Sequence, residues 1–188
     1  MRIHKIGEKH GFMYVLSAGI RPDKQIKCAD ALKRLNGFPG VSVQVLNPDA
    51  LAGEVHIITA SRLAARAWAR GEKIARSQAT EFLLYASAER QIKSAIAGMG
   101  ISKRSTGWVV IALSDSIENL RSLGDELSKF GEEDDSLIDL TEEKITPLKK
   151  QFKIDDDEIS IAERINATRM DAITSLVLER VALSDLYR

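Results

Sequence analysis

The sequence has few of the residues that most often build disulfides, metal sites or catalytic centres. Its 188 residues include four prolines, three histidines and one cysteine, and aromatic residues make up 5%. The single thiol, Cys28, cannot form a disulfide or a thiolate metal cluster within one chain. The three histidines, His4, His10 and His56, have no HExxH-type spacing. We therefore predict no bound metal.

An excess of one charge and a long apolar run are also missing. The 27 basic side chains balance 27 acidic ones, which argues against a general nucleic-acid coat but permits a local cationic patch. No run reaches the ~20 apolar residues of a membrane helix, and the first residues lack the apolar core of a signal peptide. We expect a cytoplasmic protein without a membrane partner, folded as one domain over residues 1–188.

Motifs for phosphate binding or catalysis are likewise missing. Neither GxxxxGK[ST] nor GxGxxG occurs, and we identify no nucleophile placed for a histidine base. His56 falls in a predicted helix and is interpreted as a surface or satisfied buried side chain. The acidic runs 132–135 and 155–158 lack the glycine-centred calcium loop and are interpreted as a solvated loop and a helix cap. The sequence predicts no cofactor and no enzyme.

Apolar runs and helical periodicities alternate without a strict βαβ rhythm. The predicted fold is therefore α+β, with a mixed or antiparallel sheet, several packed helices and a long C-terminal helix. The predicted strands cover 12–20, 41–45, 108–113 and a short edge at 136–140. The predicted helices cover 23–35, 50–70, 77–86, 89–99 and 116–130, two stretches opened by Thr141 and Pro147, and 155 almost to 188.

Cationic side chains gather on the helix predicted over 50–70 and on the segment after it. The candidate nucleic-acid-binding residues are Arg62, Arg66, Arg70, Lys73, Arg76 and Ser77. The three arginines lie at i, i+4 and i+8, on one helix face, where like charges repel one another. Salt bridges to neighbouring elements or hydration would compensate this repulsion, and so would contact with phosphate, which arginine binds bidentately. Backbone N–H groups beside Ser77, at a helix start, would add anion donors.

A second pattern is apolar. The candidate partner-binding residues are Ile92, Ala95, Ile96, Met99 and Gly100. Such a stripe is most often core. Small residues and methionine at a helix end also suit a partner surface, because they allow close approach.

Several segments resemble a known family. They are 45–49 (VLNPD), 74–77 (IARS), 81–84 (EFLL), 91–96 (QIKSAI), Gly100-Ile101, 148–154 (LKKQFKI) and 178–183 (LERVAL). The block from Gln44 to Ile101 carries most of the similarity. The chain resembles the PRPK-binding protein family (TPRKB in animals), the small kinase-binding subunit of the KEOPS tRNA-modification complex.

The resemblance implies a mixed α/β domain that is not an enzyme. Family members bind an atypical kinase/ATPase at one end of KEOPS, which makes threonylcarbamoyl adenosine next to the tRNA anticodon. They also bind tRNA at its single-stranded CCA end. The expected partners are thus the KEOPS kinase/ATPase subunit, at the 91–101 helix end, and tRNA, at the basic stripe. The alternatives are a protein-only adaptor that regulates its kinase without contacting RNA, and an unrecognised enzyme.

Overall fold

The fold is built on an antiparallel sheet, seen in a computed structural model that describes residues 1–7, 14–102, 105 and 107–186. The strands are β1 (Arg2–Lys5), β2 (Tyr14–Pro22), β3 (Ser42–Leu46), β4 (Trp108–Ser114) and β5 (Gly131–Glu133). Four of them lie in the order β1-β2-β4-β3, and β5 pairs with the end of β2. Every pairing is antiparallel.

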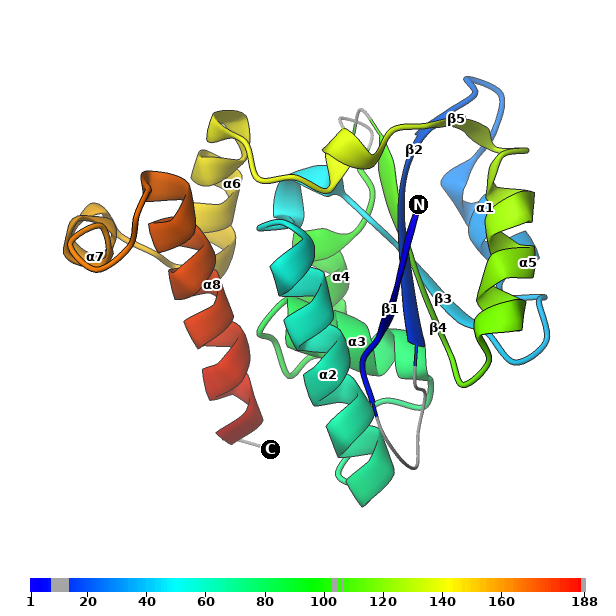
Figure 1. The fold of residues 1–188 in the computed structure, drawn as a ribbon, viewed down its shortest axis with the longest axis horizontal. Coiled ribbons are helices and arrows are strands. Elements are labelled where there is room, and N and C mark those ends of the chain that lie inside the picture. The colour runs from blue at the N-terminus through cyan, green and yellow to red at the C-terminus, as the bar shows by residue number, and fades with distance from the viewer. Residues whose placement is uncertain (8–13, 103–104, 106, 187–188) are drawn as a thin grey trace.

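Helices cover both faces of the sheet (Figure 1). On one side lie α1 (Cys28–Leu35) and α5 (Ile117–Leu127). On the other lie α2 (Glu54–Arg70), α3 (Gln78–Ala86) and α4 (Ile92–Met99), and beyond them α6 (Glu142–Phe152), α7 (Asp156–Ala162) and α8 (Arg169–Leu186). Each face carries its own apolar cluster. All seven residues of β4 are buried, as a strand covered on both faces requires.

The predicted α+β class, the antiparallel sheet and the long C-terminal helix are confirmed, with some element boundaries shifted. Of the predicted strand 12–20, residues 12 and 13 lie outside the described residues, as do His10 and residues 187 and 188. The helix predicted from residue 50 begins at Glu54, because Pro48–Ala50 forms a separate 3₁₀ turn capped by Asn47. The helix predicted from residue 23 begins at Cys28.

Three predicted elements were wrong. Residues 136–140 form no strand: the edge strand is β5, and Asp135–Leu137 is a 3₁₀ turn capped by the Asp134 side chain. The acidic run 132–135 is thus partly strand. Pro147 opens no helix but lies inside α6, where burial of Ile145, Leu148 and Phe152 compensates the lost backbone donor.

The helix predicted from residue 155 is two helices. Asp155 and Glu158 form a capping box that starts α7. The chain then turns, and α8 begins at Arg169, where the Thr168 hydroxyl accepts a hydrogen bond from the Asp171 amide at 3.1 Å. The predicted helix cap is confirmed, but at a shorter helix.

His56 is buried and both of its ring nitrogens are hydrogen-bonded, which is one of the two positions predicted for it from the sequence. Its Nδ1 accepts the Ala52 amide at 3.2 Å, so its Nε2 carries the proton and donates to the Ala86 carbonyl at 2.8 Å. Burial lowers the pKa of His56 to about 4. The imidazole is therefore neutral at pH 7 and links the start of α2 to the end of α3.

The described residues contain no helix long and apolar enough to cross a membrane. Nor does any group of three or more His, Cys, Asp or Glu side chains among them offer a metal site.

Candidate binding surfaces

The predicted basic stripe lies on the outer side of α2. Small side chains line the inner side of this helix, where Ala60, Ala64 and Ala67 are buried, so α2 packs closely on its neighbours. The arginines at i, i+4 and i+8 consequently face solvent. The helix ends at Gly71, which adopts φ +74° as its left-handed cap. We call Arg62, Arg66, Arg70, Lys73 and Arg76 the cationic surface; all five are exposed.

Only Arg66 of the cationic surface is ion-paired within the described residues; its partner is Asp185 of α8. Lys73 makes a different contact, with its Nζ 3.7 Å from the centroid of the Trp68 ring, a cation–π distance. The salt-bridge interpretation of the stripe thus holds for Arg66. The other four cations have no ion pair within the described residues, and Lys73 contacts the Trp68 ring instead.

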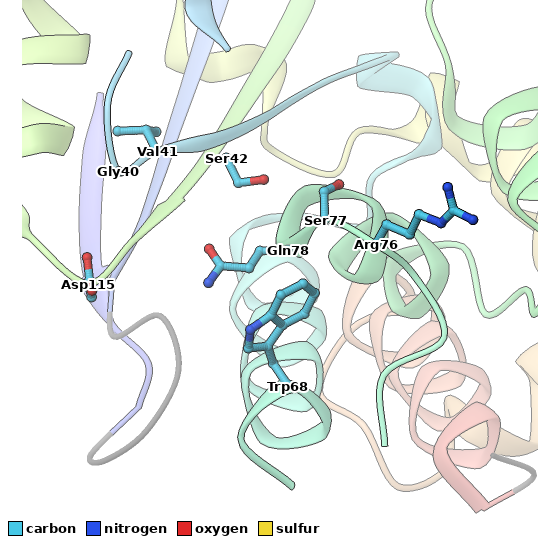
Figure 2. A pocket seen from close by; sticks show the side chains of 8 residues that line it. All are labelled: Gly40, Val41, Ser42, Trp68, Arg76, Ser77, Gln78 and Asp115. Carbon is cyan, nitrogen blue, oxygen red and sulfur yellow. The ribbon is translucent and has the colours of Figure 1, made fainter. Parts of the chain in front are cut away.

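A hollow of about 320 Å³ adjoins the cationic surface. Its lining comes from four separate segments: Gly40, Val41 and Ser42 before and in β3, Trp68 of α2, Arg76, Ser77 and Gln78 at the start of α3, and Asp115 after β4. Figure 2 shows the Trp68 ring beside Gln78 and the Arg76 guanidinium pointing away from Asp115. Trp68 was not predicted as a site residue, although its position between Arg66 and Arg70 in the sequence could have indicated it.

Ser77 caps α3 as predicted, since its Oγ accepts the Thr80 amide at 3.2 Å. The Ala79 amide donates to Ser42 Oγ at 3.0 Å. Two of the backbone donors at this helix start are therefore already used. Ser77 contributes to the hollow mainly through its position in the lining.

The predicted apolar stripe on α4 is divided between two faces. Ala95 and Met99 are fully buried in the core and hold the helix against the sheet side. Ile92 and Ile96 are 41% and 53% exposed. Gly100, half-buried, ends the helix. The outward part of the stripe is therefore the pair Ile92 and Ile96, which we call the apolar surface.

A second hollow, of about 420 Å³, runs beside α4 toward α6. Ala97 and Gly98 form one wall, and Lys150 and Gln151 the other. A Cβ placed on Gly98 would lie 2.2 Å from Gln151 Oε1, the end of a flexible side chain, so glycine leaves room for the Gln151 amide against α4. Ile92 and Ile96 do not line this hollow, which lies against Ala97 and Gly98 of the same helix.

A helix-covered sheet with a cationic surface and exposed apolar side chains, among them Ile92 and Ile96, suits a small partner-binding protein. A family model described as "Kinase binding protein CGI-121" matches residues 24–185, and the chain belongs to this family of kinase-binding proteins. The family recognised in the sequence is confirmed. A comparison with curated proteins found no match.

Proposed function

We propose that this chain is the non-catalytic subunit of KEOPS that docks on the kinase/ATPase subunit and recruits tRNA through its CCA end for threonylcarbamoyl adenosine modification. Membership of the kinase-binding family supports the docking half of the proposal. The recruitment half rests on one observation: four of the five cations on the cationic surface have no carboxylate partner within the described residues.

Unpaired cations clustered on one surface favour a polyanion, because each phosphate contact releases condensed counterions. Arginine suits phosphate through its planar fork of donors. The hollow beside Arg76 adds Trp68, and single-stranded RNA binds such sites by stacking its bases on aromatic rings. A tRNA end that is unpaired and negatively charged has both features.

Kinase docking is assigned to the apolar surface. Exposed apolar side chains on a helix are common anchors of protein interfaces. Ile96 is the more exposed of the two isoleucines, and the buried Ala95 and Met99 fix the orientation of its helix. The proposal therefore places the two partners on different helices, α4 and α2.

A mobility-shift titration with intact and CCA-trimmed tRNA tests the recruitment half. We expect tighter binding of intact tRNA, and a loss of at least roughly tenfold in affinity when Arg62 and Arg66 are both replaced by glutamate. The matched control replaces Lys33 and Arg121, exposed cations on the helices of the opposite sheet face, by glutamate. Equal affinities for all three proteins would remove the cationic surface from the proposal.

The alternative is a protein-only adaptor that regulates its kinase without contacting RNA. The net charge of zero and the Arg66–Asp185 pair favour it. It predicts that the chain co-elutes with the kinase but does not shift tRNA at physiological salt.

A further inference from the structure

A buried carboxylate lies beneath the segment that carries the last two cations of the cationic surface. Glu81, in the first turns of α3, has no exposed area. Its Oε2 accepts two backbone hydrogen bonds from the preceding segment, from the Ala75 amide at 2.7 Å and from the Ile74 amide at 3.0 Å. The segment between Gly71 and Ser77, which has no helix or strand of its own, is thereby fixed to α3.

The geometry follows from the direction of helical side chains. Residues on a helix lean toward its N-terminus, so Glu81 reaches back past the Ser77 cap toward the incoming chain. Burial of a carboxylate is unfavourable unless the group is hydrogen-bonded, and hydrogen bonds to a charged acceptor are stronger than neutral ones. The positive end of the helix dipole favours an anion at this place as well.

The two amides that Glu81 holds are flanked by Lys73 and Arg76. Lys73 lies over the Trp68 ring at 3.7 Å, and Arg76 lines the hollow beside the same ring. A fixed backbone between them therefore fixes the relative position of two cations and one aromatic side chain. Groups that are already ordered in the free protein bind a partner more tightly, because they lose little conformational entropy on binding.

We propose that Glu81 is a positioning residue: its carboxylate orders the 72–76 segment so that Lys73 and Arg76 present one pre-formed phosphate-binding surface. This inference rests on the proposed tRNA binding. If only Coulomb attraction mattered, removing a negative charge next to the cationic surface would strengthen the binding of a polyanion. If Glu81 orders the segment, removing its charge weakens that binding instead.

The test compares three variants in tRNA titrations over a range of salt. Glu81→Gln removes the charge and keeps the shape, whereas Glu81→Asp keeps the charge and shortens the reach to the amides. We expect both to bind tRNA about tenfold more weakly, with a salt slope smaller by roughly 1, the loss of about one phosphate contact. The control, Glu72→Gln, removes an exposed charge from the same segment and should bind as tightly as the wild type or more tightly.

Hydrogen exchange on the wild-type chain tests the hydrogen bonds independently of RNA. The amides of Ile74 and Ala75 should exchange at least about tenfold more slowly than those of Lys73 and Arg76, for which the described residues provide no acceptor. Equal rates at all four amides would overturn the inference, even if Glu81→Gln does not fold. So would a folded Glu81→Gln or Glu81→Asp protein that binds tRNA as well as the wild type. Failure of the wild type itself to bind tRNA would instead refute the proposed function, and the exchange result would still report on the ordered segment.

Discussion

Arg66 of α2 and Asp185 in the last turn of α8 form an ion pair that ties the cationic surface to the C-terminal helix. The second oxygen of Asp185 accepts a hydrogen bond of 2.6 Å from the Tyr85 hydroxyl of α3. One carboxylate therefore joins three helices. It also competes with any phosphate for Arg66, so the free protein holds this arginine in a paired state.

Replacing Asp185 by asparagine should change stability and RNA binding in opposite directions. We expect the free energy of unfolding to fall by about 1–2 kcal/mol, because the Tyr85 hydroxyl loses a charged acceptor. We expect tRNA affinity to rise roughly two- to fivefold, because Arg66 no longer has a competing carboxylate. Urea unfolding and a tRNA titration measure the two effects.

The matched control is Glu179→Gln, which removes the same charge from the same helix but not from Arg66. It should leave stability within about 0.5 kcal/mol of wild type. Equal gains in tRNA affinity for both variants would mean that net charge, rather than release of Arg66, sets the affinity.

Because the His56 imidazole is buried in its neutral form, the protein should lose stability in mild acid. Its folded pKa of about 4 lies below the ordinary value of 6.5, so the unfolded chain takes up a proton that the folded chain does not. The stabilisation is complete above about pH 6.5 and is lost as the pH falls toward 4. When the pH falls from 7 to 5, this group should lower the free energy of unfolding by about 2 kcal/mol.

Urea unfolding at the two pH values checks this for the wild type and for His56→Gln, which cannot titrate. The variant should be less stable at pH 7 and should lose about 2 kcal/mol less than the wild type on going to pH 5. An identical pH dependence in both proteins would show that the buried imidazole does not control acid stability.

The chain after β5 packs so closely against β2 that position 19 has no room for a side chain. A Cβ at this position would lie 2.0 Å from the Asp134 carbonyl oxygen, a backbone atom that cannot rotate away. Gly19→Ala should therefore destabilise the fold by more than about 2 kcal/mol. At Gly71 a Cβ meets no atom within 4 Å, and only the positive φ of +74° opposes it, so Gly71→Ala should cost about 1 kcal/mol. Thermal unfolding that ranks Gly71→Ala as the more damaging change would contradict the β2–β5 arrangement.

The long elements of the fold could be predicted because local patterns determine them. β4 is a run of consecutive apolar residues, and α2 shows a clear helical period that ends at a glycine. β1 and β5 are short and polar and exist only because β2 pairs with them, which no local pattern reveals. Pro147 predicted a helix start, but the packing of its neighbours in the core outweighs the loss of one backbone hydrogen bond.

The binding surfaces were predictable to different degrees. The spacing of Arg62, Arg66 and Arg70 predicted one exposed helix face, because charged side chains avoid burial. The α4 pattern could not say which apolar residues face outward, since isoleucine, alanine and methionine all suit a core. The hollow at Trp68 is assembled from segments far apart in sequence, and the role of Glu81 depends on two backbone amides that carry no sequence signal.

The proposed function assigns two separate surfaces to two partners, and paired binding measurements on two variants test this most directly. Ile96→Glu should weaken binding to the KEOPS kinase/ATPase subunit at least roughly tenfold and leave tRNA affinity unchanged, whereas Arg62→Glu combined with Arg66→Glu should do the reverse. Ile161→Glu, at a similarly exposed apolar position on α7 (61%, against 53% for Ile96), should preserve both activities. Loss of both activities in each variant, or an Ile161→Glu protein as defective in kinase binding as Ile96→Glu, would contradict the proposed function.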